Sequence, residues 1–142
     1  MTEFTTYLSF DGNCREAMRF YETVLNGKLA ALITNGETPA AEHVPPGNAD
    51  RIMHAYLVCD GFVVMAGDSM VGQHRPMQGF HLTLSYTDVA EAQRVYDALS
   101  EGGTVEMPFQ PTFWAERFGM LTDRFGTPWI INGGNAPEGG MA

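Results

Sequence analysis

Alternation of apolar and polar residues is the dominant pattern along this chain. Residues 5–10 (TTYLSF) and 80–86 (FHLTLSY) alternate with period two and are rich in β-branched and aromatic side chains, a pattern that is typical of strands with one buried face. Asp60-Gly61 and the segment Arg124-Phe125-Gly126 have the composition of tight turns between neighbouring strands. The pattern predicts strands at residues 5–10, 28–34, 51–59, 61–67, 80–86, 104–109, 117–123 and 127–132.

Two segments follow a helical rhythm instead. Apolar residues recur at intervals of three and four in residues 14–25 and again in residues 89–99, which predicts one amphipathic helix in each segment. Asn13 and Asp88 come just before these helices, where a short polar side chain can accept the free N–H groups of the first turn. Gly27 and Gly102 follow them, where we expect a left-handed residue to close the last turn.

The two predicted helices belong to an internal repeat. When the sequence is shifted by 75 residues, EAMRFYETVLNG (16–27) lies on EAQRVYDALSEG (91–102) without a gap, with five identities in twelve positions. Such self-similarity favours a duplicated unit, although two amphipathic helices can also resemble each other by chance. Each copy then reads as a βαβββ module, and the runs of three strands joined by short turns predict an α+β fold.

The chain is predicted to be a single domain over residues 1–142, built from module 1 at about residues 1–70 and module 2 at about residues 78–133. A Pro/Gly-rich loop covers residues 36–50, and residues 68–79 join the modules. Residues 134–142 read as a tail, since they are rich in Gly and lack either periodicity.

Charge and composition exclude several classes of partner. The formal net charge is −9, so neither nucleic acid nor an anionic membrane is expected to bind. No apolar run is long enough to span a bilayer, and no basic segment followed by an apolar stretch begins the chain. Cys14 and Cys59 form no C-x-x-C motif and are expected to be buried as small apolar residues. We therefore expect a cytoplasmic protein.

Three segments, residues 7–29, 60–69 and 112–132, carry a family resemblance. They resemble the vicinal oxygen chelate superfamily, which includes glyoxalase I, extradiol dioxygenases and bleomycin-resistance proteins, and in particular its PhnB-like branch. The resemblance implies two βαβββ modules that curl into open β-barrels, each able to enclose a small-molecule ligand, and it implies a homodimer.

The resemblance also implies four positions at which metal-dependent members hold a divalent ion with His or Glu. Counted from the helix caps and the last turn of each module, these positions are Thr6, Met65, His81 and Ile130. Only His81 is a suitable ligand for such an ion. We therefore predict no metal ion and no other cofactor, unless a shift in register brings His54 or Asp68 into the site.

An aromatic and charged segment near the end of module 2 is the candidate wall of a ligand pocket. Alternation places Phe118 and Met120 on one face of their strand, and Phe113, Trp114 and Glu116 come just before it. Pockets of this kind are mostly apolar with a few placed polar groups. The predicted pocket residues are His54, Asp68, His81, Phe113, Trp114, Glu116, Phe118, Met120 and Trp129.

Each of these residues also has a structural interpretation. Any single ring can be part of the hydrophobic core, His54 can be a satisfied strand residue, and Asp68 can form a turn with its own backbone. For the aromatic cluster as a whole the pocket interpretation is favoured. Without a ligand, the Phe and Trp rings of this non-helical segment would be exposed beside charged Glu and Arg side chains.

Two functions remain open from the sequence. The first is a metal-independent small-molecule-binding protein with a degenerate metal site. The second is a metal-dependent lyase or isomerase of the glyoxalase type that uses a displaced metal through His54, Asp68 or His81. PhnB-like sequences are sometimes labelled 3-demethylubiquinone methyltransferases, but no Gly-rich turn suited to S-adenosylmethionine follows the first strand. No hydrolase motif is present either.

Overall fold

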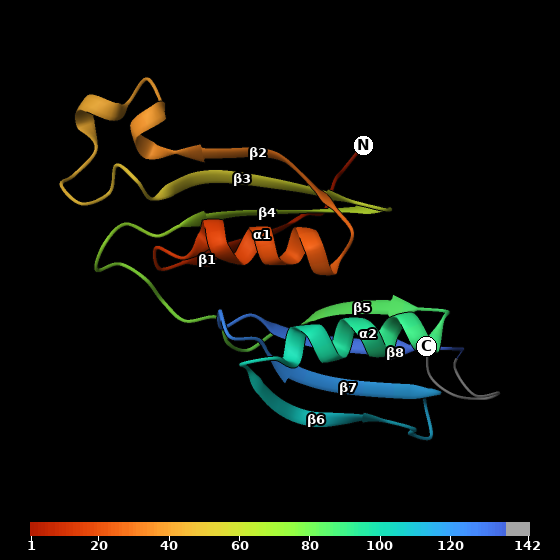
Figure 1. Ribbon diagram of the computed structural model, residues 1–142. Coiled ribbons are helices and arrows are strands. Elements are labelled where there is room, and N and C mark those ends of the chain that lie inside the picture. The colour runs from red at the N-terminus through yellow and green to blue at the C-terminus, as the bar shows by residue number, and fades with distance from the viewer. Residues whose placement is uncertain (136–142) are drawn as a thin grey trace. The chain divides into compact units, whose positions relative to one another are not determined.

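The computed structural model describes residues 1–135, which form two compact units with the boundary between Pro76 and Met77. We call residues 1–76 unit 1 and residues 77–135 unit 2. Each unit contains one α-helix and one four-stranded sheet, so the predicted pair of βαβββ modules is confirmed (Figure 1). Neither α-helix in residues 1–135 has the length and apolar character needed to cross a bilayer.

In unit 1 the helix α1 follows the first strand, as the repeat predicts. The sheet has the order β1-β4-β3-β2, in which β1 runs parallel to β4 and the other neighbours are antiparallel. Two short 3-10 turns, η1 (Asn35–Glu37) and η2 (Ala41–His43), lie inside the predicted Pro/Gly-rich loop. The elements are β1 (Thr6–Phe10), α1 (Cys14–Val24), β2 (Lys28–Thr34), β3 (Ile52–Cys59) and β4 (Phe62–Asp68).

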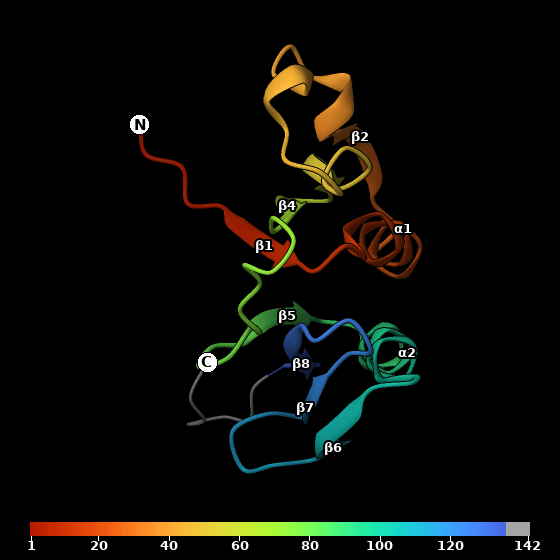
Figure 2. The same ribbon diagram turned by 90° about the vertical axis from the view of Figure 1, so that its left-hand side faces the viewer.

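Unit 2 repeats this topology, with sheet order β5-β8-β7-β6 and β5 parallel to β8. Figure 2 shows α2 on one side of this sheet, whose strands curl without closing into a barrel. The elements are β5 (Leu82–Tyr86), α2 (Val89–Ser100), β6 (Thr104–Gln110), β7 (Arg117–Thr122) and β8 (Pro128–Gly133).

Each core lies between the helix and one face of its own sheet. In unit 1 the fully buried side chains include Phe10, Tyr21 and Leu57, and in unit 2 they include Leu99, Leu121 and Ile131. Each unit has one α-helix in the described residues, and it packs on one face of the sheet, so the other face carries no α-helix of its own unit. We call these helix-free faces the open face of unit 1 and the open face of unit 2.

Two glycines let α2 approach its sheet closely. A Cβ on Gly119 of β7 would lie 2.5 Å from Cε2 of Tyr96, and a Cβ on Gly133 of β8 would lie 2.8 Å from Cβ of Ala92. Tyr96 stacks on Phe109 of β6 with ring centroids 5.2 Å apart, and its hydroxyl donates to the Met107 carbonyl. Gly119, Gly133 and Phe109 therefore lie on the side of the sheet that faces α2.

Two details of the helix ends differ from the sequence prediction. Asp88 caps α2 as expected, since its carboxylate accepts from the Ala90 N–H at 2.9 Å, but the Asn13 side chain makes no capping bond to α1. Gly102 has the expected positive φ of 74°, whereas after α1 the left-handed residue is Asn26, with φ 53°, and not Gly27. Gly27 is required for another reason, because a Cβ there would lie 2.8 Å from Sγ of Cys59.

Both cysteines are buried free thiols, as predicted. Burial raises the pKa of Cys14 to about 12, with a smaller contribution from the negative charge of Asp68. Burial also raises the pKa of Cys59. Neither sulfur is therefore a reactive thiolate near neutral pH.

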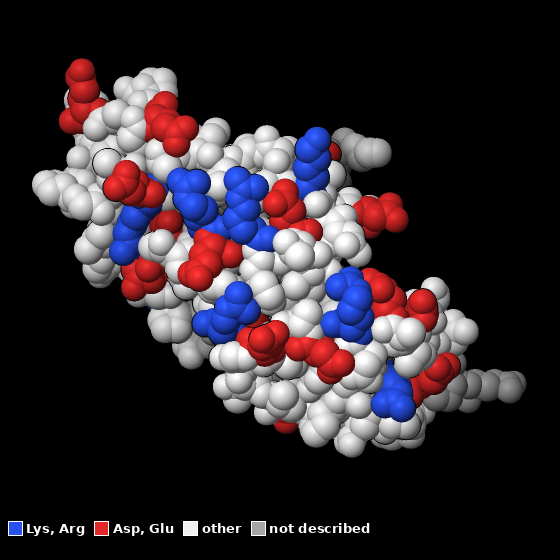
Figure 3. Space-filling view, viewed as in Figure 1, with Lys and Arg blue, Asp and Glu red and all other residues white. Residues whose placement is uncertain are grey.

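The charged surface is mixed in sign. On the face seen in Figure 3, Lys and Arg side chains are interspersed with Asp and Glu. Exposed pairs such as Arg94–Glu91 (2.6 Å) and Arg19–Glu22 (3.3 Å) bridge residues three apart on the helices. Exposed pairs of this kind contribute little to stability.

Candidate functional site

The open face of unit 2 is the first candidate site. Gly119 and Leu121 of β7 face the helix side, so alternation directs Phe118, Met120 and Thr122 to the open face. These side chains are only partly buried, although two of them are large and apolar. An apolar surface that no element of its own unit covers suits a bound ligand.

An aromatic run extends this face beyond the sheet. Trp114, in the segment between β6 and β7, contacts Phe118 edge to face with ring centroids 5.2 Å apart. Phe113 contacts Trp114 in the same way at 4.8 Å, while 82% of its own surface is exposed. The structure thus brings together three of the predicted pocket aromatics, and Phe113 forms the outer end.

A polar cluster lies on the same face. Nε2 of His81, just before β5, lies 3.2 Å from Oε2 of Glu106 on β6, and Oε1 of Glu106 accepts from the Thr122 hydroxyl at 2.6 Å. The pKa of Glu106 is lowered mainly by the hydrogen bond from the Thr122 hydroxyl and, to a lesser extent, by the hydrogen bond with the His81 imidazole. Farther along the face, the Asn132 amide donates to the Ser85 hydroxyl at 3.2 Å.

The contact between His81 and Glu106 shows how far this sheet curls. Strands β5 and β6 are the two edges of the sheet. In a flat sheet of four strands the edges would be roughly 14 Å apart. Curling turns both edges toward the open face, so the two side chains meet across it.

Trp129, a predicted pocket residue, lies in the core of unit 2. It is 2% exposed and faces α2, and its indole N–H donates to the Asp123 carboxylate at 2.9 Å. The reason is register, since Leu121 and Trp129 are paired and both point into the core. Trp129 therefore lies on the opposite side of the sheet from Phe118 and belongs to the core.

Glu116 and Met120 are the remaining predicted pocket residues in unit 2. Glu116 is exposed, and its side chain lies against Gly134, which has φ +83°. Met120 is paired with Ile130 of β8, so both lie on the open face.

The open face of unit 1 has a different character. His54 of β3 stacks on Tyr7 of β1 with ring centroids 6.5 Å apart, and it meets Tyr56 at 6.2 Å. Tyr56 is paired with Met65 of β4, which places a thioether beside these rings. His54 is partly buried in an aromatic and apolar surface. This face offers rings and one imidazole, and it lacks a counterpart of the His81–Glu106 pair among the residues that the structure describes.

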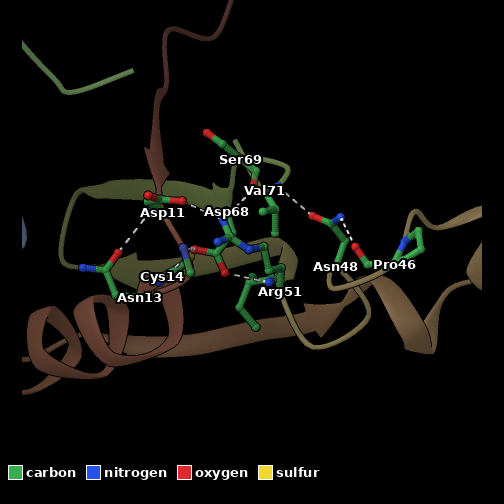
Figure 4. A network of polar contacts seen from close by, with 11 residues as sticks. Asp11, Asn13, Cys14, Pro46, Asn48, Arg51, Asp68, Ser69 and Val71 are labelled. Carbon is green, nitrogen blue, oxygen red and sulfur yellow. Dashed lines mark hydrogen bonds and ion pairs between the residues drawn. The ribbon is translucent and has the colours of Figure 1, made fainter. Parts of the chain in front are cut away.

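Asp68 serves the backbone of unit 1. Its Oδ1 accepts from the N–H groups of Gly12 (2.8 Å) and Cys14 (3.0 Å), and its Oδ2 accepts from the N–H of Ile52 (2.8 Å) (Figure 4). It thus satisfies a free amide at the start of α1 and ties that helix to β3 and β4. The two carboxylate oxygens are committed to the fold.

Arg51 supports the same junction. Its Nη1 donates to Oδ1 of Asp11 at 2.9 Å and to the Ser69 carbonyl at 2.8 Å (Figure 4). Asn48, 3% exposed, accepts from the Val71 N–H at 2.9 Å and so joins the long loop to the segment after β4. The Pro/Gly-rich loop is therefore fastened to the strand ends.

The metal ion that the family resemblance implies does not fit the residues at its four positions. Met65 and Ile130 do lie on open faces, but neither is a ligand for a hard or borderline divalent ion. Thr6 is paired with the buried Val64, and the counterpart of His81 by register is Thr5. This one-residue difference arises because the β1–α1 connection is one residue longer than the β5–α2 connection.

A displaced site through His54 and Asp68 is also disfavoured by geometry. The two side chains lie on opposite faces of one sheet, since Ala55 and Ala66 are paired and buried beneath α1. Within residues 1–135, no group of three or more His, Cys, Asp or Glu side chains is arranged to hold a metal ion.

Glu106 and Thr122 belong to the polar cluster but not to the set of pocket residues predicted from the sequence. The segment TVEMPF (104–109) is predicted as a strand, and alternation from Thr104, which pairs with Thr122, places Glu106 on the open face. The register shift between Val105 and Met107 interrupts the alternation along β6, and the sequence gives no sign of that shift. His81, the partner of Glu106, is 25 residues away, and no local signal connects them.

Comparison with known proteins gives one family. Residues 4–131 match the family model described as the Glyoxalase/Bleomycin resistance protein/Dioxygenase superfamily. Protein YjdN of Escherichia coli K12 is 40% identical over 134 residues, covering 89% of this chain and 91% of its own.

Solved structures agree with the fold. Protein PA1353 of Pseudomonas aeruginosa is 42% identical and superposes with a TM-score of 0.87, covering 94% of this chain and 98% of its own. The PhnB protein of Bacillus cereus superposes with a TM-score of 0.79 at 24% identity, covering 93% and 99% of the two chains. The second similarity concerns the fold alone.

Proposed function

This chain belongs to the Glyoxalase/Bleomycin resistance protein/Dioxygenase superfamily, and we propose that it is a small-molecule-binding member of the PhnB-like kind that works without a metal ion. The observation that carries the proposal is the open face of unit 2. There, partly exposed apolar side chains lie beside a hydrogen-bonded polar cluster. Binding surfaces for small molecules combine these two features.

The apolar part of the face suits a flat ligand. Phe118 and Trp114 present ring edges and faces to each other, and Met120 and Ile130 extend the apolar surface. A planar hydrocarbon body bound here would bury apolar area, and this burial would contribute about 25 cal/mol of binding free energy per Å². Ring contacts would add about 1 kcal/mol each.

The test uses 2-methoxynaphthalene, a planar probe that donates no hydrogen bond. We expect the probe to shift the amide signals of β7 in ¹H–¹⁵N correlation spectra. Phe118→Ala should weaken its binding about tenfold, because the ring contact and apolar area are lost. Phe62→Ala, which removes an exposed ring from β4 of unit 1, is the matched control and should leave the affinity unchanged. Absence of β7 shifts up to the solubility limit of the probe would overturn the proposal.

The alternative function is a metal-dependent lyase or isomerase. His81 and Glu106 are two ligand types in one place, whereas catalytic zinc sites use three protein ligands. Elemental analysis of the purified protein separates the two functions. Stoichiometric metal that is lost in His81→Ala supports the enzyme, and probe binding that survives dialysis against EDTA supports the binding protein.

The proposal includes a homodimer, which the family resemblance implies, and a location in the cytoplasm. Sedimentation velocity should give a mass near twice 15.6 kDa. A thermal-shift measurement with S-adenosylmethionine completes the set. Stabilisation by this compound and not by the naphthalene probe would favour a methyltransferase.

A further inference from the structure

The polar cluster on the open face of unit 2 holds an imidazole in one orientation. His81, Glu106 and Thr122 come from three parts of the sheet, namely the residue before β5, β6 and β7. Their side chains form the chain Thr122 hydroxyl to Glu106 carboxylate to His81 ring. The side chains of His81 and Glu106 are 25% and 35% exposed, so the cluster is open to a ligand and still partly desolvated.

The chain of donors and acceptors assigns the proton on His81. An ionised carboxylate only accepts hydrogen bonds, and the Thr122 hydroxyl already donates to Oε1 of Glu106. The ring atom next to Oε2, which is Nε2, must therefore be the donor. In a neutral imidazole the other nitrogen then carries the lone pair, so Nδ1 is an acceptor. Within residues 1–135, Nδ1 of His81 has no hydrogen-bond partner.

The row of side chains next to the polar cluster on the open face contains two large apolar residues, Ile130 and Met120. Alternation from Leu82, which pairs with Trp129 on the helix side, turns His81 and Thr83 to the open face. Thr83 is paired with Ile130, and Ile130 with Met120. A flat ligand lying on Met120 and Phe118 would thus have one edge available for a polar contact with the cluster.

From this arrangement we infer that His81 is the polar anchor of the site and that it selects ligands carrying a hydrogen-bond donor, such as the hydroxyl of a phenol or enol, on a planar apolar body. Nδ1 of His81 accepts the hydrogen bond, and Glu106 and Thr122 are positioning residues that keep Nδ1 in the acceptor form. This inference rests on the proposed function and adds to it the chemical class of the ligand.

The first test reads the tautomer directly. Long-range ¹H–¹⁵N spectra of the ¹⁵N-histidine-labelled protein above pH 7.5 should show His81 protonated at Nε2 and bare at Nδ1. Glu106→Gln should give a mixture of the two tautomers, because an amide can either donate to Nε2 or accept from it. A wild-type His81 protonated at Nδ1 would overturn the inference.

The second test compares two probes that differ in a single donor. We expect 2-naphthol to bind at β7 about fivefold more tightly than 2-methoxynaphthalene, which corresponds to one hydrogen bond of ordinary strength. His81→Ala, Glu106→Gln and Thr122→Val should each reduce the ratio of the affinity for 2-naphthol to the affinity for 2-methoxynaphthalene. The matched control is Glu91→Gln, which changes a partly exposed glutamate on α2 of the same unit and should keep the full preference.

The outcomes separate the inference from the proposed function. Equal affinities for the two probes in the wild-type protein would overturn the role of His81 and leave the apolar site in place. A preference for 2-naphthol that survives in both Glu106→Gln and Thr122→Val would also overturn it. Failure of both probes to perturb β7 would remove the proposed function together with the inference. Dispersed spectra of each variant verify that it is folded.

Discussion

Each unit places one strand carboxylate in contact with several hydrogen-bond donors, but on opposite faces of its sheet. In unit 1, Asp68 at the end of β4 faces the helix side and accepts from three backbone N–H groups. In unit 2, Glu106 on β6 faces the open side and interacts with two side chains, Thr122 and His81. A carboxylate held by backbone amides is part of the framework, whereas one held by side chains on a helix-free face can orient a group toward a ligand.

Strand register identifies what unit 2 has in place of Asp68. Phe10 at the end of β1 is paired with Asp68, and Tyr86 at the end of β5 is paired with Gly133. The next backbone bonds also match, with Ser69 N–H to the Phe10 carbonyl and Gly134 N–H to the Tyr86 carbonyl, both at 2.8 Å. Gly133 is therefore the counterpart of Asp68.

The N-terminus of α2 is consequently capped by a neighbouring residue in the sequence, and the N-terminus of α1 by a distant one. In unit 2, Gly133 lets Ala92 of α2 approach, and the capping carboxylate is the local Asp88. In unit 1, the local Asn13 does not cap, and the remote Asp68 bonds the first helical amide. Duplicated units can thus satisfy a free amide in the first turn of the helix with a local residue, as at Ala90, or with a distant one, as at Cys14.

The largest expected effect is that of removing Asp68. Asp68→Ala should lower the free energy of unfolding by about 3 to 4 kcal/mol, because three amides lose a charged acceptor. Urea unfolding followed by circular dichroism measures this loss. A loss below about 1 kcal/mol would show that Asp68 is not the cap of α1.

A side chain at Gly133 should also be costly. Gly133→Ala would place a Cβ 2.8 Å from Cβ of Ala92 and 2.9 Å from Cζ of Phe109. Overpacking of this kind costs about 1 to 3 kcal/mol. The control is Gly126→Ala, where a Cβ would meet nothing within 4 Å, so that only the strain of φ +95° remains. If Gly133→Ala were neutral, α2 would not depend on close approach at this position.

The local caps should differ between the units. Asp88→Ala should lower the free energy of unfolding by about 1 kcal/mol, a typical value for an N-cap. Asn13→Ala should cost less than about 0.5 kcal/mol, because the Asn13 side chain accepts from the Asp11 N–H and from no helical amide. Equal losses in the two variants would contradict the assignment of Asp68 as the cap of α1.

The smallest effect concerns Glu106, which is partly exposed. Its folded-state pKa is lowered by the Thr122 hydroxyl and by His81, so its contribution to stability is present above the unfolded pKa of about 4.3 and is lost as the pH falls through the folded value. Thr122→Val should raise the pKa of Glu106 toward its ordinary range, as measured by ¹³C NMR titration of the side-chain carboxyl. An unchanged pKa in that variant would show that the Thr122 hydroxyl does not hold this carboxylate.

A last comparison uses the two tryptophans of the chain. Trp114 lies on the aromatic run and is partly exposed, while Trp129 is 2% exposed beneath α2. In single-tryptophan variants, acrylamide should quench the emission of Trp114 several-fold more efficiently than that of Trp129. Similar quenching of both would contradict their placement on opposite faces.

The sequence by itself determined the elements and their order. Period-two alternation located the strands, the three-and-four spacing located α1 and α2, and Asp88 was recognised as a cap, because each of these signals depends on residues a few positions apart. The placement of Phe118 and Met120 on one face followed from the same local rule.

Only the tertiary structure decided which face of each sheet is buried beneath the helix and which side chains that are distant in the sequence meet. Both alternating sets of β8 are rich in apolar residues, so the burial of Trp129 depended on its pairing with Leu121 and on the close packing of Gly133 against α2. The use of Asp68 as a helix cap depended on the parallel pairing of β1 with β4. The meeting of His81 with Glu106 depended on the curl of the sheet. Register and curvature arise from contacts between residues far apart in the chain, and local periodicity carries no record of them.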